Sequence, residues 1–331
     1  MQTNGRKLLT IAIPTYKRSA YLARLLSVLA LQLIDEPRVE LIVSDNASPD
    51  DTPTIIEGFQ KKGLQLTYIR NETNIGADAN FLQCFEEATG KYVWLVGDDD
   101  IIVPTAIEKV LTYLSREEYD LVYVSSYGIQ GSYQPSVPLN SKEASEFGTP
   151  EELARRVHVF FTFMSGNIIN KDRVCSAIHM PFSNLVGTNL VQLGWVYTAL
   201  NGHKRSLFIH EPLIAATTNN TGGYRLFTVF GSSLARITEE WLNSETVKRP
   251  IINGTLQKFF PIFLLSTKKK NSGFVEENPD HILRPVFKTN FRYWVFNFPI
   301  IWMPSWLARI WFLVGRGINK LDSIMGAPLV R

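Results

Sequence analysis

Three carboxylates stand side by side at residues 98–100, directly after the apolar run 92–96 (YVWLV) and Gly97. Adjacent ionised acids repel one another and raise each other's pKa unless a cation lies between them. Magnesium and manganese prefer oxygen ligands and keep room for water and for substrate phosphates. The segment therefore predicts a site for Mn²⁺ or Mg²⁺ with a diphosphate. The alternative is a solvated acidic turn before the helix that begins at Pro104.

Asp45 and Asn46 follow a second apolar run, residues 41–43. A carboxylate in that place can accept a hydrogen bond from a nucleobase ring N–H or exocyclic amine, and an asparagine side chain can both donate and accept. Turn chemistry explains Asp45 equally well, as support for the turn before a helix capped by Ser48. Both interpretations stay open.

The polar segments 14–18 (PTYKR) and 71–76 (NETNIG) follow two further apolar runs. The first offers a hydroxyl, an aromatic ring and cations, and the second offers amide groups and a glycine that lets a ligand approach the backbone. If these runs are strands of one parallel sheet, their ends share the edge where such folds bind ligands. The sequence contains neither G-x-G-x-x-G nor G-x-x-x-x-G-K-[ST], which argues against dinucleotide-dependent oxidoreductases and P-loop NTPases.

The first 125 residues alternate apolar runs with amphipathic segments, which predicts an α/β fold with a mostly parallel sheet and crossover helices. The expected strands are 9–13, 40–43, 66–69, 92–96 and 121–124. Residues 127–148 are rich in Gly, Ser and Pro and predict a mobile connection. The expected elements beyond this connection are a helix over 151–163 capped at Thr149, a strand over 165–170 and a helix over 189–200.

The C-terminal segment is aromatic and basic. After Leu283 there are seven basic residues and one acidic residue, a net charge of +6, and the whole chain carries +3, so residues 1–283 carry −3. Residues 293–315 contain Pro299 and Pro304, which makes them a poor membrane-spanning helix. Their tryptophans and the flanking cations predict a helical segment on the surface of a membrane. Packing on the protein body, or a dimer contact, is the alternative.

The 331-residue chain is long enough for one large or two modest domains. Cys84 and Cys175 are too few for a disulfide framework, and both are expected to be buried thiols. The apolar run 8–14 is too short for the hydrophobic region of a signal peptide, which predicts a cytoplasmic protein.

Four motifs, in this order, resemble glycosyltransferase family 2, which has a GT-A fold. The family's P-T-Y-N-R is matched by residues 14–18, its Asp-rich motif ending in Thr by 45–52, and its N-x-G by 74–76. Its metal motif, D-x-D-D with a proline four residues later, aligns with 97–104. Gly97 stands where the family has its first acid.

The resemblance implies a GT-A-type nucleotide-binding sheet with flanking helices in residues 1–126, an acceptor-binding half in 127–245, and a membrane-proximal helical tail in 246–331. It implies transfer of a hexose or deoxyhexose from a nucleoside diphosphate sugar to a glycan or lipid-linked glycan, with Mn²⁺ or Mg²⁺ as cofactor and no nucleic-acid partner. Within the family the chain looks most like O-antigen sugar transferases of the abequosyltransferase type. That likeness implies surface polysaccharide synthesis on the inner face of the cytoplasmic membrane.

The match also implies roles for single residues. It places Asp99 at the metal-ligand position, with Asp100 as a further ligand. The residues implied to bind the nucleotide sugar are Pro14, Thr15, Tyr16, Asp45, Asn46, Asn74 and Asp98.

The general base is not identified. Inverting members of the family carry an acidic base about a dozen residues before a glycine such as Gly202, but residues 188–192 (TNLVQ) contain no carboxylate. Asp172 and Glu211 are poor candidates, so inverting and retaining routes both stay open. Two other functions also stay open: a sugar nucleotidyltransferase, and a catalytically inactive carbohydrate-binding or scaffold subunit.

Overall fold

The computed structural model describes residues 5–130, 144–218, 223–268 and 275–325. The chain forms two compact units. Residues 1–153 and 160–220 make the larger unit, and residues 154–159 and 221–331 make the smaller one. The assignment of donor, acceptor and membrane roles to 1–126, 127–245 and 246–331 stays a prediction.

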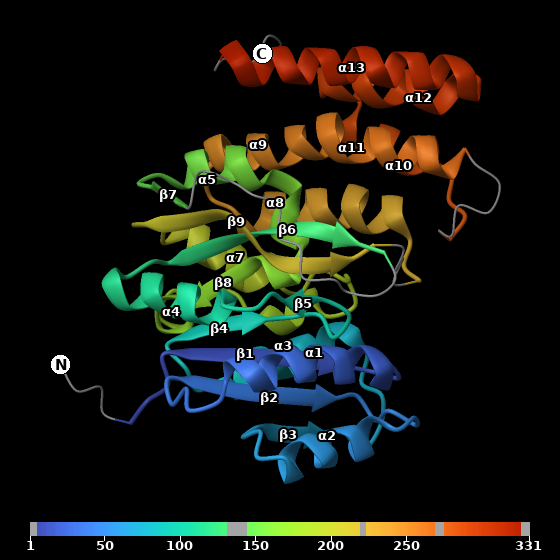
Figure 1. Ribbon diagram of the computed structural model, residues 1–331. Coiled ribbons are helices and arrows are strands. Elements are labelled where there is room, and N and C mark those ends of the chain that lie inside the picture. Colours follow the sequence, from blue (N-terminus) through green and yellow to red (C-terminus); the bar gives the residue numbers. More distant parts are fainter. Residues whose placement is uncertain (1–4, 131–143, 219–222, 269–274, 326–331) are drawn as a thin grey trace. The chain divides into compact units, whose positions relative to one another are not determined.

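The larger unit is built on one sheet, with strand order β3-β2-β1-β4-β8-β6-β9-β5 and with β7 paired to β9 (Figure 1). The strands β1 to β4 run parallel, β8 is antiparallel to both β4 and β6, and β9 is parallel to β6. The five strands expected in the first 125 residues are therefore confirmed, while the sheet beyond β4 is mixed. The strands are β1 (Leu9–Thr15), β2 (Val39–Asp45), β3 (Thr67–Arg70), β4 (Tyr92–Leu95), β5 (Ile101–Ile102), β6 (Leu121–Ile129), β7 (Ala144–Phe147), β8 (Asn167–Asn170) and β9 (Ser206–Thr217).

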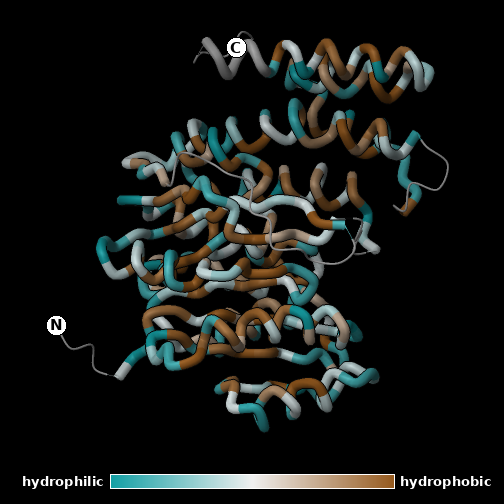
Figure 2. Tube along the Cα trace, in the orientation of Figure 1, coloured by the Kyte–Doolittle hydropathy of each residue, from teal (hydrophilic) through white to brown (hydrophobic). Residues whose placement is uncertain are grey.

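Hydrophobic residues recur along the strands and along the helices beside them (Figure 2). Ile11 of β1 belongs to a buried cluster that also contains Leu25 of α1 and Val110 of α4. Elsewhere, Phe85 of α3 stacks on Trp195 of α7, with ring centroids 4.7 Å apart. The helices are α1 (Ser19–Gln32), α2 (Thr52–Lys61), α3 (Ala77–Glu87), α4 (Ala106–Arg116), α6 (Lys171–Ser176) and α7 (Leu193–Asn201). Helix α5 (Pro150–Val157) begins in the larger unit and ends in the smaller one.

The predicted cap at Ser48 is wrong. Helix α2 begins at Thr52, because the backbone N–H of Ser48 donates to the Asp45 carboxylate (2.8 Å) and its hydroxyl accepts from the backbone of Lys17 (2.9 Å). The Asp50 carboxylate accepts from the backbone and hydroxyl of Thr52 instead. Ser48 therefore belongs to a turn, and the side chain that accepts hydrogen bonds from the first residue of α2 is that of Asp50.

The helix expected over 189–200 begins only at Leu193. The buried carboxylate of Asp78, on α3, accepts from the N–H groups of Gly187 and Asn189, both at 2.8 Å, and of Val191 at 3.5 Å. Asn189 also has φ +60°, a left-handed conformation that does not continue a helix. Residues 187–191 are therefore a loop held by one acid.

Other expectations have mixed outcomes. The cap at Thr149 is confirmed, because its hydroxyl accepts from the N–H of Glu152 and donates to the carboxylate of the same residue. The expected connection 127–148 includes the end of β6 and the whole of β7, and residues 131–143 lie outside the described part of the chain. Cys84 is buried as predicted, but Cys175 is exposed.

The smaller unit is helical and has an aromatic core. Phe227, Phe260, Phe287 and Tyr293 belong to one buried cluster. Among the described residues, no helix combines the length and the apolar character that crossing a membrane requires. The helices are α8 (Leu234–Trp241), α9 (Glu245–Gly254), α10 (Phe260–Thr267), α11 (Pro279–Phe287), α12 (Phe298–Trp302) and α13 (Ser305–Met325), with short π-helical turns at Thr228–Ser233, Thr255–Phe259 and Tyr293–Asn297.

Replacement of Asp78 by alanine should destabilise the larger unit, because it leaves backbone N–H groups of the 187–191 loop without their acceptor. Each buried donor that loses its partner costs about 1–3 kcal/mol, so we expect the free energy of unfolding to fall by at least that amount. Urea denaturation measures the change. Glu87→Ala is the matched control, since Glu87 is an exposed acid on the same helix and should shift stability by less than about 0.5 kcal/mol. Equal stability of the two variants would contradict the prediction.

His158 should make the smaller unit sensitive to acid. Burial lowers its pKa to about 3, and the charges of Lys258 and Arg156 act in the same direction. In the unfolded chain the pKa of His158 is 6.5, so below this pH the unfolded state binds a proton that the folded state does not bind. The free energy of unfolding therefore falls as the pH drops below 6.5. Between pH 7.5 and 5 the wild type should lose about 1–2 kcal/mol more than His158→Asn. Asparagine suits the positive φ at this position, and urea titrations at both pH values measure the difference. Parallel losses in the two proteins would refute the assignment.

Candidate functional site

The carboxyl ends of β1, β2 and β4 lie side by side, because these strands are parallel neighbours (Figure 1). Thr15, the last residue of β1, is opposite Asp45, the last residue of β2. The Thr15 hydroxyl donates to Asp98, just beyond β4, at 2.7 Å. The expectation that Asp45 and residues 98–100 share one edge of the sheet is therefore confirmed.

Asp98 is buried and is held by Thr15 of β1 and by Arg18, the residue before α1. One carboxylate oxygen accepts from Thr15, and the other accepts from the Arg18 guanidinium at 3.1 Å. Burial raises the pKa of Asp98 to about 6, while the charge of Arg18 opposes this rise and that of Asp99 adds to it. Asp98 is thus a desolvated acid that depends on a nearby cation for its ionisation.

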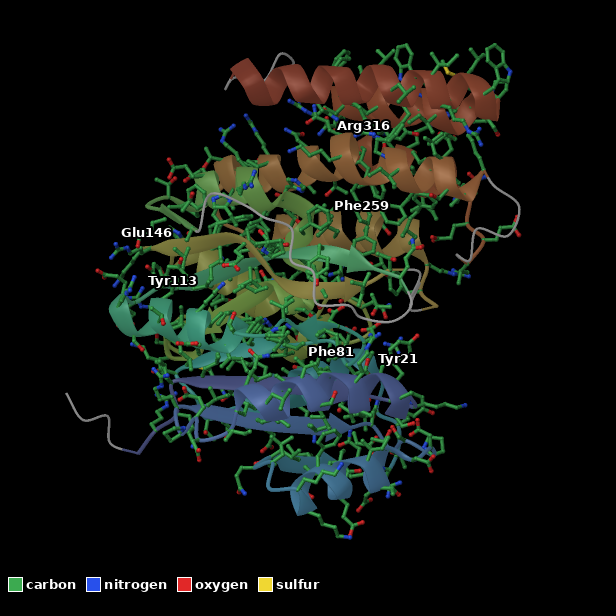
Figure 3. All side chains as sticks on the ribbon, viewed as in Figure 1. Tyr21, Phe81, Tyr113, Glu146, Phe259 and Arg316 are labelled. Carbon is green, nitrogen blue, oxygen red and sulfur yellow. The ribbon has the colours of Figure 1, made fainter. Side chains whose placement is uncertain are left out.

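Asp99 is held through its backbone. Its carbonyl oxygen accepts from the Arg24 guanidinium at 2.9 Å and from the Thr217 hydroxyl. The guanidinium of Arg24 also lies 5.4 Å from the centroid of the Tyr21 ring, which Figure 3 labels on α1. The Asp99 side chain is 16% exposed, against 5% for Asp98. Asp99 therefore presents the more accessible carboxylate on a fixed backbone.

Asp100 is buried and contacts later parts of the sheet. It accepts from the Ser165 hydroxyl at 2.6 Å and from the Thr217 backbone at 3.2 Å. Burial raises the pKa of Asp100 to about 7, and the charge of Asp99 adds to the rise. Both carboxylate oxygens thus have protein donors, and the role of Asp100 as a metal ligand stays a prediction.

Gly97 lies close to two of these acids and adds no side chain that would crowd them. A Cβ atom there would lie 3.1 Å from Asp99 Oδ1 and 3.3 Å from Asp100 Oδ2. Its backbone N–H donates to the Ser165 hydroxyl at 2.9 Å, so Ser165 joins Gly97 to Asp100. Sequence reasoning missed Ser165 because a lone serine before a short strand carries no local signal.

Asp45 is fully buried and supports the structure around it. It accepts from the backbone of Ser48 at 2.8 Å and from the Tyr68 hydroxyl at 2.8 Å. Its oxygen Oδ2 also lies 3.6 Å from Nε of Arg70. The turn-supporting interpretation is therefore correct, and the nucleotide-binding role of Asp45 stays a prediction.

Asn46 joins β2 to the loop that precedes α3. Its amide donates to the Asn74 side chain at 2.9 Å, and its carbonyl oxygen accepts from the backbone of Ile75 at 2.9 Å. Of the other two predicted residues, Pro14 is buried in β1 and Tyr16 is exposed. The structure thus brings Asn46 and Asn74 into contact at the edge that carries Thr15.

The carboxylates at this edge of the sheet limit how a metal could bind. Among the residues that the structure describes, no group of three or more His, Cys, Asp or Glu side chains is arranged to hold a metal ion. Magnesium and manganese, however, often take one or two carboxylates and complete their shell with substrate phosphates and water. Asp99 on its fixed backbone fits a metal shared with a diphosphate better than a metal held by protein ligands alone.

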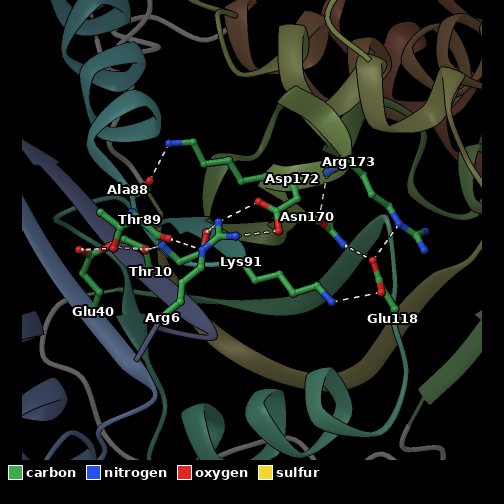
Figure 4. A network of polar contacts seen from close by, with 12 residues as sticks. Arg6, Thr10, Glu40, Ala88, Thr89, Lys91, Glu118, Asn170, Asp172 and Arg173 are labelled. Carbon is green, nitrogen blue, oxygen red and sulfur yellow. Dashed lines mark hydrogen bonds and ion pairs between the residues drawn. The ribbon is translucent and has the colours of Figure 1, made fainter. Parts of the chain in front are cut away.

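Both weighed candidates for a general base are ion-paired. Arg6 donates to the two oxygens of Asp172 at 2.9 and 2.8 Å, and it also donates to the carbonyl of Gly90, before β4, so Asp172 lies near the amino end of that strand (Figure 4). Glu211 accepts from Lys109 of α4 at 2.5 Å. The base stays unassigned.

The chain is similar to known proteins in sequence. The family model for glycosyl transferase family 2 matches residues 10–176. Abequosyltransferase RfbV of Salmonella typhimurium is 35% identical over 111 residues, 33% of this chain and 33% of that protein. A Campylobacter jejuni GalNAc(5)-diNAcBac-PP-undecaprenol beta-1,3-glucosyltransferase is 28% identical over 104 residues, 31% of this chain and 33% of that protein. The matched region spans about a third of each of these relatives.

Two solved structures share the fold over nearly the whole chain. Staphylococcus aureus TarS 1–349 in complex with UDP-GlcNAc has a TM-score of 0.58 at 19% identity, covering 97% of this chain and 92% of that one. The mannosyltransferase PcManGT from Pyrobaculum calidifontis, in complex with GDP-Man and Mn²⁺, has a TM-score of 0.54 at 13% identity, covering 96% and 88%. The predicted α/β fold of the GT-A type is confirmed.

Proposed function

Because the chain belongs to glycosyl transferase family 2, we propose that it transfers a hexose or deoxyhexose from a nucleoside diphosphate sugar to an acceptor hydroxyl. The observation that carries the proposal is the geometry at the ends of β1, β2 and β4, where Asp99 presents a carboxylate from a fixed backbone. The complexes of TarS with UDP-GlcNAc and of PcManGT with GDP-Man, on the same fold, support a sugar-nucleotide donor.

We assign donor binding to the predicted residues at this edge. Asp99, with Asp100 behind it, would hold Mn²⁺ or Mg²⁺ jointly with the donor diphosphate. Once bound, that ion supplies positive charge that stabilises the diphosphate as a leaving group. Asp98, which accepts a hydrogen bond from Thr15, would lie beside the ribose and diphosphate. The residues that would contact the nucleoside are Pro14, Tyr16, Asp45, Asn46 and Asn74.

The acceptor is proposed to be a glycan or a lipid-linked glycan, bound by residues 127–245. The similarity to the abequosyltransferase and to the enzyme acting on an undecaprenol-linked glycan supports an acceptor of this class in surface polysaccharide synthesis. We place the enzyme in the cytoplasm, at the inner face of the cytoplasmic membrane. The missing carboxylate in residues 188–192 leaves open whether transfer inverts or retains the anomeric configuration.

The C-terminal helix α13 supports a membrane partner because it has two apolar faces. One face packs within the smaller unit: Ala308 is fully buried, and the Trp311 indole donates to the carbonyl of Val295 at 2.7 Å. The other, here called the outer face, consists of exposed side chains at helical spacing, which are Trp306, Ile310, Leu313 and Val314, with Trp302 of α12 before them. Packing on the protein body explains the first face, which leaves a membrane or a dimer contact for the outer face. Together with the net charge of +6 after Leu283, the outer face fits an anionic bilayer surface.

Asp99→Asn should lower donor turnover by about 10²–10³-fold, because a lost carboxylate would weaken the hold on the ion that stabilises the leaving group. EDTA should have the same effect on the wild type, and Mn²⁺ should restore it. Release of UDP, CDP, GDP or dTDP from the matching sugar nucleotides measures turnover and names the donor.

Asp172→Asn is the control for Asp99→Asn, since it removes a carboxylate that pairs with Arg6 near the amino end of β4. It should retain turnover. Full activity of Asp99→Asn, or of the wild type in EDTA, would disprove the metal assignment. Donor binding without turnover of any donor would favour the inactive carbohydrate-binding subunit.

Trp306→Glu combined with Leu313→Glu should release the protein from anionic vesicles, because both side chains are 63% exposed on the outer face. Loss of two apolar side chains that would insert into the bilayer, and the added charge repulsion, should lower the partition coefficient about tenfold or more. Co-sedimentation with phosphatidylglycerol vesicles measures it, and high salt should weaken wild-type binding only in part. Leu31→Glu, on α1 in the larger unit and 77% exposed, should bind as the wild type does. Equal binding of all three proteins would rule out the outer face as the attachment surface.

A further inference from the structure

One guanidinium nitrogen bridges two acids of the site. Arg18 Nη1 lies 3.1 Å from Asp98 Oδ1 and 3.4 Å from Asp99 Oδ2. The two carboxylates face a single positive group, which offsets their mutual repulsion. Arg18 therefore supplies positive charge at Asp99, the carboxylate that is also proposed to hold the divalent ion.

The Arg18 side chain can leave this position without undoing the fold. Its backbone carbonyl, and not its side chain, accepts from the N–H groups of Tyr21 and Leu22 at the start of α1. One third of the side chain is exposed, so it borders solvent and not the core. The long side chain of an arginine can thus change partners while the helix start stays intact.

A guanidinium and a divalent cation cannot both lie at ion-pair distance from Asp99 without strong mutual repulsion. A guanidinium also matches phosphate oxygens with two parallel hydrogen bonds. A nucleoside diphosphate that reaches the site would therefore offer Arg18 an alternative partner of equal or greater negative charge.

We propose that Arg18 is an exchangeable counter-cation of the site: it holds Asp98 and Asp99 when no nucleotide is bound, and it transfers to the diphosphate when donor and metal bind. This inference rests on the proposed metal and diphosphate site at Asp99. Arg18 is then a positioning residue. In the free protein its charge at the acids opposes metal binding, and with nucleotide bound it pairs with the diphosphate and leaves the acids to the metal. Metal and nucleotide then bind with positive coupling, each raising the affinity for the other by the same factor.

Mn²⁺ binding at pH 8, followed through the electron paramagnetic resonance signal of free Mn²⁺, tests this inference. Wild type, Arg18→Gln and Arg18→Lys are titrated alone and with UDP, CDP, GDP or dTDP. Arg18→Gln should bind Mn²⁺ about tenfold more tightly than the wild type without nucleotide, because the competing charge is gone. The factor by which nucleotide improves Mn²⁺ affinity should shrink correspondingly. Arg18→Lys should stay near the wild type in both measurements.

Lys17→Gln is the matched control, since it removes an exposed charge from the adjacent residue. It should change Mn²⁺ affinity by less than about threefold, the scale of an exposed charge in water. A merely structural role for Arg18 would weaken Mn²⁺ binding in Arg18→Gln, or leave it unchanged. Either result, in a protein whose wild type binds Mn²⁺ with nucleotide, overturns the exchange and leaves the proposed function standing. A wild type that binds no Mn²⁺ with any of the nucleotides overturns both.

Discussion

Repulsion among three adjacent carboxylates at the end of a buried strand is the constraint on which the larger unit depends. Each acid is accommodated differently: Asp98 by donors from β1 and the start of α1, Asp99 through its backbone, and Asp100 by donors from Ser165 and β9. These donors come from segments far apart in the sequence, so the site forms only when both halves of the sheet are assembled. The parallel and the mixed parts of the sheet thus stabilise one acidic turn together.

Periodicity was sufficient to predict the parallel strands, and parallel strands imply a common edge for Thr15, Asp45 and Asp98. The contacts across that edge were not predictable. Ser165 lies 65 residues from Asp100, and a lone serine just before a strand has no pattern that marks it as an anchor. The helix expected from residue 189 failed for a related reason, because Asp78, 111 residues away, takes the N–H of Asn189 and holds a loop there. The local hydrophobic pattern thus predicts which helices and strands form, whereas hydrogen bonds from residues distant in the sequence determine where some of them begin.

The smaller unit shows a different limit of sequence reasoning. Its aromatic, basic composition suggested a membrane surface, with packing on the protein body or a dimer contact as the alternative. The structure gives α13 two such surfaces, with Ala308 on the packed face and Trp306 on the outer face. Composition cannot separate two apolar stripes on one helix when both are rich in tryptophan and aliphatic residues. Which side of α13 is packed and which is exposed is known only once the helices that pack against it are known.

The contact of Asp78 with the 187–191 loop has a consequence for the divergence of related enzymes. Helix α3 starts directly after the segment that bonds Asn46, and its second residue holds a loop in the half of the chain assigned to the acceptor. A substitution that shifts the start of α3 to suit another nucleotide would also move this loop. With residues 127–245 proposed to bind the acceptor, donor and acceptor preferences would not change independently, and related enzymes that differ in one are expected to carry compensating changes in the other.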